Sequence, residues 1–269
     1  MNNAPEHNRR IWDERARQRK AHTHPASDKE FDNARAVLDE CGWLPASLKG
    51  VRVLCLAAGG GWHGPLFAWL GADVTVVDIS EEMLDLDRKV SAERRLPVKL
   101  VQASMDDLSV LPRASFQAVI QPVSTSYVSD IRKVYREIAQ VTAPRGLYIS
   151  QHKQPASLQA SVLPGAAGYT LIEPYYKTEP LPPEIDSLQH REAGALEFIH
   201  KWEELLGSLC RSGFVIEDLV EPRHADATAR PGSFAHRSCY LPPYVTIKAR
   251  RQAKAAVGSI WRSDSTAPP

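Results

Sequence analysis

A glycine-rich loop constrains the fold of this chain more than any other feature. Residues 59–64 have the sequence GGGWHG, which satisfies the pattern G-x-G-x-x-G letter for letter. An apolar run at 51–56 precedes the loop, and a helical pattern with Pro65 in its first turn follows it. Glycines at these spacings let a backbone approach a ligand closely where a strand passes into a helix. The loop therefore predicts an α/β fold with a ligand site at the end of its first strand.

Short β-branched runs alternate with longer segments of helical period along the middle of the chain. This pattern is typical of a parallel sheet covered by helices on both faces. The expected strands are 51–56, 74–77, 98–101, 116–120, 147–150, 214–219 and 244–249. The expected helices are 64–70, 80–90, 131–141 and 202–209. In the second helix we expect Met83, Leu86 and Val90 to face the sheet. The predicted fold class is a doubly wound, Rossmann-like sheet of seven strands.

The chain is expected to consist of one α/β domain with three additions. The domain covers 47–250, a helical segment covers 1–46, and a C-terminal tail covers 251–269. A stretch at about 155–195 is rich in proline and tyrosine and lacks a sustained period, which predicts a long insertion or lid. The segment around Trp12 is amphipathic, and the pattern leaves open whether it closes over a ligand or lies on the surface.

Composition excludes several classes of protein. The 269 residues are 43% hydrophobic and 24% charged, and they carry a formal net charge of +1. This gives no overall positive field of the kind that recruits nucleic acid or an anionic membrane surface. No stretch approaches the ~18 apolar residues that span a bilayer, and the first residues lack an apolar signal segment. We expect a cytoplasmic protein that acts on a small molecule.

Cysteine and histidine spacing argues against a metal site. The cysteines are Cys41, Cys55, Cys210 and Cys239. They lack C-x-x-C spacing and lie in or beside apolar stretches, which predicts reduced, structural thiols. His22 and His24 have the spacing of a metal pair, but without further clustered ligands an H-x-H sequence is usually a polar loop. We expect no metal.

Two kinds of cofactor compete for the glycine loop. In nicotinamide or flavin enzymes such a loop approaches a pyrophosphate, and an acid about 20 residues on binds the ribose hydroxyls. Asp78, after the second expected strand, fits that spacing. The same two features are also what an S-adenosylmethionine site needs, because that cofactor has a ribose but no phosphates. The loop alone does not decide between an oxidoreductase and a methyltransferase.

Five landmarks in order resemble the class I S-adenosylmethionine-dependent methyltransferase superfamily. Residues 53–61, VLCLAAGGG, are similar to its first-strand motif, usually VLDLGCGTG. The other landmarks are VDIS at 77–80, VQASMDDL at 101–108, FQAVIQPVSTSYVSD at 116–130 and VTAPRGLYIS at 141–150. The resemblance implies S-adenosylmethionine as cofactor and methyl transfer to a small molecule as activity. It also implies that the strand at 244–249 is antiparallel and lies between the fifth and sixth strands.

The resemblance also implies a set of cofactor-binding residues. These are Ala57, Gly59 and Gly61 in the loop, Asp78 and Ile79 after the second strand, Ser104, Met105 and Asp106 after the third, and Gln121 at the end of the fourth. We expect Asp78 to accept hydrogen bonds from both ribose hydroxyls.

Two positions depart from the pattern of the family. Cys55 occupies the position where the family usually has an acid that organises the loop and helps to hold the cofactor's ammonium group, and Ala57 replaces the first glycine. The role of that acid must therefore come from elsewhere in the chain. A pseudo-enzyme with a degenerate pocket remains an alternative to an active enzyme.

The methyl acceptor is expected beyond the carboxyl ends of strands four and five, where ligands of open parallel sheets bind. This selects His152 and Tyr127 as candidate catalytic residues. His152 is the titratable candidate for a base, which a methyl transfer needs only when the acceptor carries a proton that must leave; otherwise it shapes the rim of the pocket. Tyr127 either positions an acceptor or packs on the following helix.

Substrate class is the least constrained expectation. LPPY at 241–244 resembles the motif with which nucleic-acid amino-methyltransferases bind an exocyclic amine, but it precedes the last strand instead of following the fourth, so we expect no nucleic-acid substrate. The tyrosines of the insertion are Tyr169, Tyr175 and Tyr176. They predict either the wall of an acceptor pocket for a flat or amphipathic molecule or a contact in a homodimer.

Overall fold

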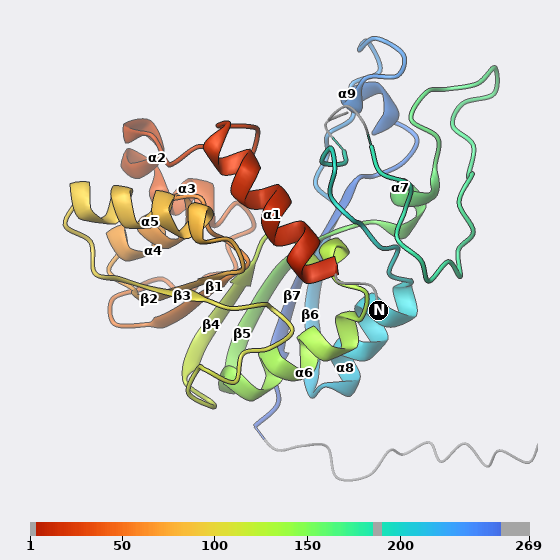
Figure 1. Cartoon of the computed structure of the whole chain (residues 1–269). Coiled ribbons are helices and arrows are strands. Elements are labelled where there is room, and N and C mark those ends of the chain that lie inside the picture. The colour runs from red at the N-terminus through yellow and green to blue at the C-terminus, as the bar shows by residue number, and fades with distance from the viewer. Residues whose placement is uncertain (1–3, 185–189, 254–269) are drawn as a thin grey trace, which may run out of the picture.

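The computed structural model describes residues 4–184 and 190–253, and within them seven strands form one sheet (Figure 1). The strands are β1 Arg52–Leu56, β2 Asp73–Asp78, β3 Val98–Gln102, β4 Phe116–Gln121, β5 Thr142–Lys153, β6 Phe214–Val220 and β7 Tyr244–Arg251. Their order is β3-β2-β1-β4-β5-β7-β6. Strands β1 to β5 pair in parallel, while β7 is antiparallel to both β5 and β6. The predicted fold class is confirmed, with the antiparallel strand between the fifth and sixth.

Two hydrophobic cores lie on opposite faces of the sheet, because successive strand residues point to opposite sides. Leu54 and Leu56 pack with α6 (Ile131–Val141) and α8 (Ser208–Arg211). Val53 and Cys55 pack on the other face, which α4 (His63–Trp69) and α5 (Glu81–Glu93) cover. Figure 1 shows these two groups of helices on either side of the sheet. No helix in the described part of the chain is long and apolar enough to cross a membrane.

Helix α5 starts where its sequence predicts and buries Met83 and Val90 as expected, but Asp87 takes the buried position expected for Leu86. Ser80 is the N-cap, and its hydroxyl accepts a hydrogen bond from the backbone of Met83. The buried stripe contains Met83, Asp87 and Val90, whereas Leu86, predicted to face the sheet, is only half-buried. The acid takes a core position because it binds the glycine loop, as described below.

Strand β5 is longer than predicted at both ends. Its first residue, Thr142, pairs with Phe116 ahead of an irregularity in the register. At the other end the ladder with β7 continues to Lys153, which pairs with Tyr244. The additional residues after Ser150 therefore belong to the sheet and not to a loop.

Five further helices belong to the described part of the chain. They are α1 Ala4–Arg17, α2 Asp28–Asp32, α3 Ala34–Leu38, α7 Pro155–Gln159 and α9 Phe234–Arg237, with a 3₁₀ turn at Thr125–Tyr127 and a π-helical turn at Glu203–Gly207. The expected insertion is mostly irregular where it is described. In Figure 1 helix α1 runs between α5 and the loops of the insertion. Most of the expected C-terminal tail, 254–269, lies outside the described residues.

Candidate functional site

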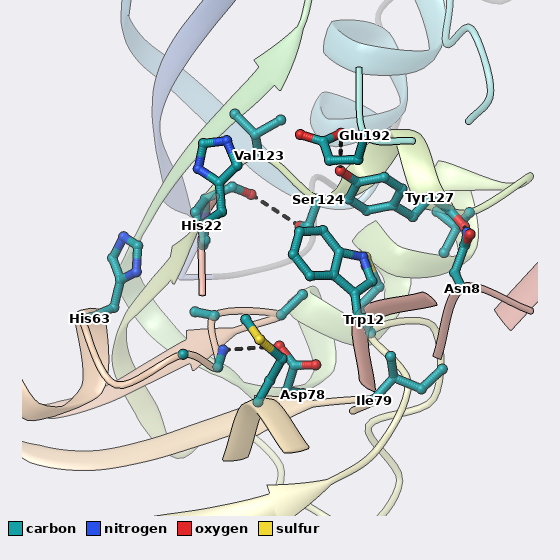
Figure 2. Close-up of a pocket in the computed structure, with 18 of the residues that line it drawn as sticks. Asn8, Trp12, His22, His63, Asp78, Ile79, Val123, Ser124, Tyr127 and Glu192 are labelled. Carbon is teal, nitrogen blue, oxygen red and sulfur yellow. Dashed lines mark hydrogen bonds between the residues drawn. The ribbon is translucent and has the colours of Figure 1, made fainter. Parts of the chain in front are cut away.

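A cavity of about 500 Å³ opens at the carboxyl ends of the parallel strands. Its walls come from α1, the loop at 22–24, the glycine loop, and the segments that follow β2, β3 and β4. Gln151, Glu192 and Tyr244 complete the lining. Figure 2 shows Asp78 and Glu192 at opposite ends of the view, with the indole of Trp12 between them. The chain segments that meet here are far apart in sequence, so the fold assembles the site.

The glycine loop presents its backbone to the cavity in a conformation that side chains disfavour. Gly60 and Gly61 have φ of 122° and 76°, and Ala57 also has a positive φ, 48°. A Cβ on Gly59 would lie 2.8 Å from that of Met83, so nothing larger than glycine fits there. Of the predicted loop residues, Ala57 and Gly59 line the cavity, while Gly61 turns the chain behind it.

Asp78 lies at the end of β2 with its carboxylate in the cavity wall. Its Oδ1 accepts a hydrogen bond from the Ser80 backbone N–H at 3.0 Å, and its Oδ2 accepts one from Gly59 at 2.9 Å. Burial raises the pKa of Asp78 to about 6, and these backbone bonds oppose the rise. Each oxygen keeps a further lone pair, so the carboxylate can accept two more hydrogen bonds. Ile79, also predicted, lines the cavity beside it.

Asp87 is a loop-binding residue that the sequence analysis missed. Its Oδ2 accepts hydrogen bonds from the backbone N–H groups of Gly60, at 2.8 Å, and Gly61, at 3.0 Å. The side chain is fully buried, and its Oδ1 has no partner among the described residues. Burial raises the pKa of Asp87 to about 7. An acid at helical spacing between Met83 and Val90 was the available signal.

Some of the predicted residues after β3 and β4 line the cavity, and the others contact those lining residues from outside it. Ser104 and Met105 line the cavity. Asp106 does not: one carboxylate oxygen accepts a hydrogen bond from Ser104 at 2.5 Å, and the other lies 3.1 Å from the Lys133 ammonium. Asp106 therefore positions the serine without facing the ligand space.

Gln121 is likewise buried outside the lining. It accepts a hydrogen bond from the Tyr148 hydroxyl at 2.6 Å and donates one to the Ser124 hydroxyl at 3.0 Å. Ser124 itself lines the cavity. The amide thus supports the segment after β4 from behind.

His152 does not lie in the cavity wall, contrary to its expected place. The imidazole is fully buried, and its nitrogens are 2.8 Å from the hydroxyl oxygens of Thr125 and Ser150. Burial lowers its pKa to about 3, so the ring stays neutral. Because β5 continues to Lys153, side chains alternate, and Gln151 lines the cavity instead. We therefore assign His152 to support of the turn at Thr125–Tyr127, a correction of its predicted catalytic role.

Tyr127 lines the cavity and is joined to an ionic network in its wall. Its hydroxyl donates a hydrogen bond to Glu192 Oε2 at 2.5 Å. Lys153 lies 2.8 Å from the same oxygen and also pairs with Glu197. Although burial alone would raise it, the Lys153 ammonium lowers the pKa of Glu192 to about 2. Both described bonds end on Oε2, so Oε1 of an ionised carboxylate is left for the cavity.

Charge in the cavity wall is one-sided. Asp78 and Glu192 line it, together with the histidines at 22, 24 and 63, and its lining within the described ranges includes no lysine or arginine. Burial lowers the pKa of His63 to about 4, which keeps that ring neutral at pH 7. The described residues contain no cluster of three or more metal-ligating side chains around the H-x-H pair. The described lining therefore offers no lysine or arginine to a polyanionic ligand such as a pyrophosphate.

Helix α1 spans the cavity and is fastened at both sides. Asp13 accepts a hydrogen bond from the Ser80 hydroxyl at 2.6 Å on the side of α5. On the other side Asn8 donates to the backbone carbonyls of Tyr127 and Leu196, at 3.0 and 2.9 Å. Between these contacts Trp12 packs edge-on against Tyr127, with ring centroids 5.6 Å apart. Trp12 thus lines the cavity, while its closing over a ligand stays a prediction.

The tyrosines of the insertion do not line the cavity, which corrects the expected acceptor wall. Tyr169 packs against His236 and Tyr240. Tyr176 is 78% exposed, and the Tyr175 hydroxyl accepts a hydrogen bond from the backbone of residue 202. The insertion instead contributes Glu192, and the LPPY segment contributes Tyr244.

Comparison with known proteins gives a consistent result. Residues 54–150 match the family model described as a methyltransferase domain. The chain is 34% identical over 184 residues to the uncharacterized methyltransferase YbaJ of Bacillus subtilis, covering 67% of this chain and 72% of that protein. It is 32% identical over 119 residues to a ubiquinone biosynthesis O-methyltransferase of Xanthomonas campestris, covering 44% of this chain and 50% of that protein. A solved S-adenosylmethionine-dependent methyltransferase from Mesorhizobium loti is 27% identical, with a TM-score of 0.63 over 82% of this chain and all of that one.

Proposed function

The chain belongs to the class I S-adenosylmethionine-dependent methyltransferases, and we propose that it methylates a small molecule bound between the glycine loop and Glu192. The observation that carries this proposal is the single cavity with two polar ends. Asp78 and the loop backbone form one end, and the Tyr127–Glu192 pair forms the other. A cavity of about 500 Å³ suits a small acceptor better than a polymer.

The residues at the first end fit the cofactor. Asp78 would hold the ribose hydroxyls with the lone pairs that Gly59 and Ser80 leave free. Gly59 has no side chain, so the backbone of the glycine loop forms the surface against which the methionine portion of the cofactor would lie. Ser104 and Met105 would contact the adenine. The pyrophosphate of a nicotinamide dinucleotide would have to enter a cavity lined by two carboxylates and, in the described residues, by no lysine or arginine. This charge favours S-adenosylmethionine, which is cationic at its sulfur.

The cofactor supplies a methyl group on a sulfonium, and methyl transfer forms one bond to the acceptor and breaks the bond to sulfur. The protein then has to align the acceptor and exclude water. Hydrogen bonds of Asp13 and Asn8 hold helix α1 on both sides of the cavity, so its Trp12 stays in the cavity wall and would help to exclude water. Glu192 Oε1 would accept a hydrogen bond from the acceptor, orient its lone pair, and take up the nucleophile's proton as the bond to the methyl carbon forms. Lys153 keeps that carboxylate ionised, and Tyr127 fixes its position.

We therefore propose an acceptor whose nucleophile carries a proton, a hydroxyl or an amine, and which has no negative charge. An oxygen acceptor is supported by the likeness to ubiquinone biosynthesis O-methyltransferases, whose name states transfer to oxygen. A carboxylate or phosphate near the nucleophile would find no lysine or arginine among the described lining residues, because Lys153 lies behind Glu192 and is already paired with it.

The proposal is tested by radiolabelled methyl transfer into a cell extract divided into small molecules and macromolecules. We expect label from S-adenosyl-[methyl-³H]methionine in the small-molecule fraction, and a loss of most of it with Glu192→Gln. The variant should still bind S-adenosylhomocysteine, because Glu192 lies at the other end of the cavity from Asp78 (Figure 2). The half-buried acid Glu184, which pairs with Arg191 outside the cavity, provides the matched control Glu184→Gln. Label confined to protein or nucleic acid would contradict the proposal.

A further inference from the structure

Asp87 binds the cofactor loop from helix α5, at a position that the family pattern does not assign to this role. Its carboxylate holds the N–H groups of Gly60 and Gly61, the two residues whose φ values lie in the region that side chains disfavour. Asp78 holds the N–H of Gly59 in the same way. Three consecutive amides of the loop are thus bound by two acids, one from the end of β2 and one from α5.

Cys55 occupies the position at the end of β1 where the family usually has an acid. The thiol is fully buried, and burial together with the nearby Asp87 charge raises its pKa well above the usual range. A neutral thiol is a weak hydrogen-bond acceptor and cannot hold the loop as a carboxylate does. Val76, which pairs with Cys55 across the sheet, and Asp87 Oδ1 both lie within 3.0 Å of the Cβ position on Gly64, so the carboxylate lies near the end of β1.

Burying an acid at the position of Asp87 raises the free energy of the folded state, so packing alone does not explain why an acid occupies it. The side chain is buried with no cationic partner in the described part of the chain, and the nearby Asp78 adds repulsion. Its Oδ1 has no hydrogen-bond partner among the described residues. An apolar side chain at this core position would avoid these penalties. The only described partners of the carboxylate outside its own residue are the amides of the loop.

Gly64 provides the space for this arrangement. A Cβ at position 64 would lie 2.4 Å from Val76 Cγ2 and 3.0 Å from Asp87 Oδ1. The third glycine of the G-x-G-x-x-G pattern therefore lets helix α4 approach both the strand and the acid. Two glycines of the pattern thus contact Asp87, Gly61 through its backbone N–H and Gly64 through the space that its missing side chain leaves.

We propose that Asp87 is the positioning residue that orders the cofactor loop in place of the acid missing at Cys55. It acts through the backbone of Gly60 and Gly61 and does not line the cavity itself. The inference rests on the loop being the cofactor site. In this chain the carboxylate that binds the loop backbone comes from α5, where the family pattern has it at the end of β1.

The test exchanges the position of the acid. Binding of S-adenosylhomocysteine is measured by calorimetry, and thermal unfolding is measured in parallel, for wild type, Asp87→Ala, the double variant Cys55→Asp/Asp87→Ala, and Asp85→Ala. Asp85 is a half-exposed acid on the same helix and is the matched control. We expect Asp87→Ala to weaken binding about tenfold or more, the double variant to recover most of that loss, and Asp85→Ala to bind as wild type.

A structural role alone would lower the melting temperature of Asp87→Ala and leave its affinity unchanged, and that result would overturn the inference. A double variant that folds but does not recover affinity would overturn it as well. If Asp87→Ala does not fold, the double variant decides: folding with restored binding supports the inference, and failure to fold or bind contradicts it. If wild type itself does not bind S-adenosylhomocysteine, the proposed function fails instead, which separates the two claims.

Discussion

Replacing Asp78 by alanine should weaken cofactor binding without unfolding the protein. The carboxylate bonds two backbone amides and keeps lone pairs for two ribose hydroxyls. A hydrogen bond to a charged group contributes about 1.5–3 kcal/mol, and about 1.4 kcal/mol is a tenfold change in affinity. Loss of one ribose bond therefore weakens binding about tenfold, and loss of both about hundredfold or more.

Calorimetric titration with S-adenosylhomocysteine at pH 8 measures this effect, because the pKa of Asp78 near 6 leaves the carboxylate ionised there. Asp73→Ala is the matched control, since Asp73 is an exposed acid at the other end of the same strand. The fold should survive, because removing Asp78 also removes a buried charge whose ionisation burial disfavours. A folded Asp78→Ala variant with the affinity of wild type would refute the assignment of the ribose to this residue.

Three further predictions concern stability. Burial raises the pKa of Asp87 from 3.8 to about 7, so between these pH values the unfolded chain binds fewer protons than the folded one, and stability falls as pH rises. Asp87→Asn should therefore raise the melting temperature at pH 8 and change it little near pH 4. An equal shift at both pH values would contradict this linkage. Gly64→Ala should lower stability by about 1–3 kcal/mol in urea unfolding because its Cβ would meet Val76 at 2.4 Å, and an unchanged midpoint would contradict this packing. Lys153→Met should lower the free energy of unfolding by about 3–5 kcal/mol, because Glu192 would lose its cationic partner among the described residues while Glu197 would keep Arg191. A urea midpoint equal to that of wild type would contradict this.

The sheet could be predicted from the sequence because its patterns are local. Helix α6 buries Ile131, Val134, Ile138 and Val141 at helical spacing, as its sequence indicates. The strands appear as short apolar runs between such helices. The order of β7 and β6 came from the family resemblance, since nothing in the two strand sequences alone fixes which of them lies beside β5.

The error at His152 came from one misplaced strand end. Ending the strand at Ser150 puts His152 in a loop at the rim of the cavity. The ladder with β7 instead continues to Lys153, so His152 stays in the sheet and points to the face of Ser150, where Tyr135 of α6 also packs. The pairing depends on a partner strand almost a hundred residues away, which a local pattern does not contain.

Asp87 and Glu192 were missed for different reasons. An acid on an amphipathic helix usually indicates its solvent face, so the periodicity assigned Leu86 to the core and overlooked Asp87. Glu192 lies in an irregular segment with no period, and its partners Tyr127 and Lys153 are distant in sequence. The three-dimensional structure was needed to bring these charges together.

The most direct test of the central claim is the cofactor preference of the unmodified chain. Purified protein is titrated by calorimetry with S-adenosylhomocysteine and, separately, with NAD⁺. Asp78, the loop backbone and a lining without lysine or arginine in the described residues predict saturable binding of S-adenosylhomocysteine, one per chain, and no binding of NAD⁺. Saturable binding of NAD⁺ without a response to S-adenosylhomocysteine would contradict the account.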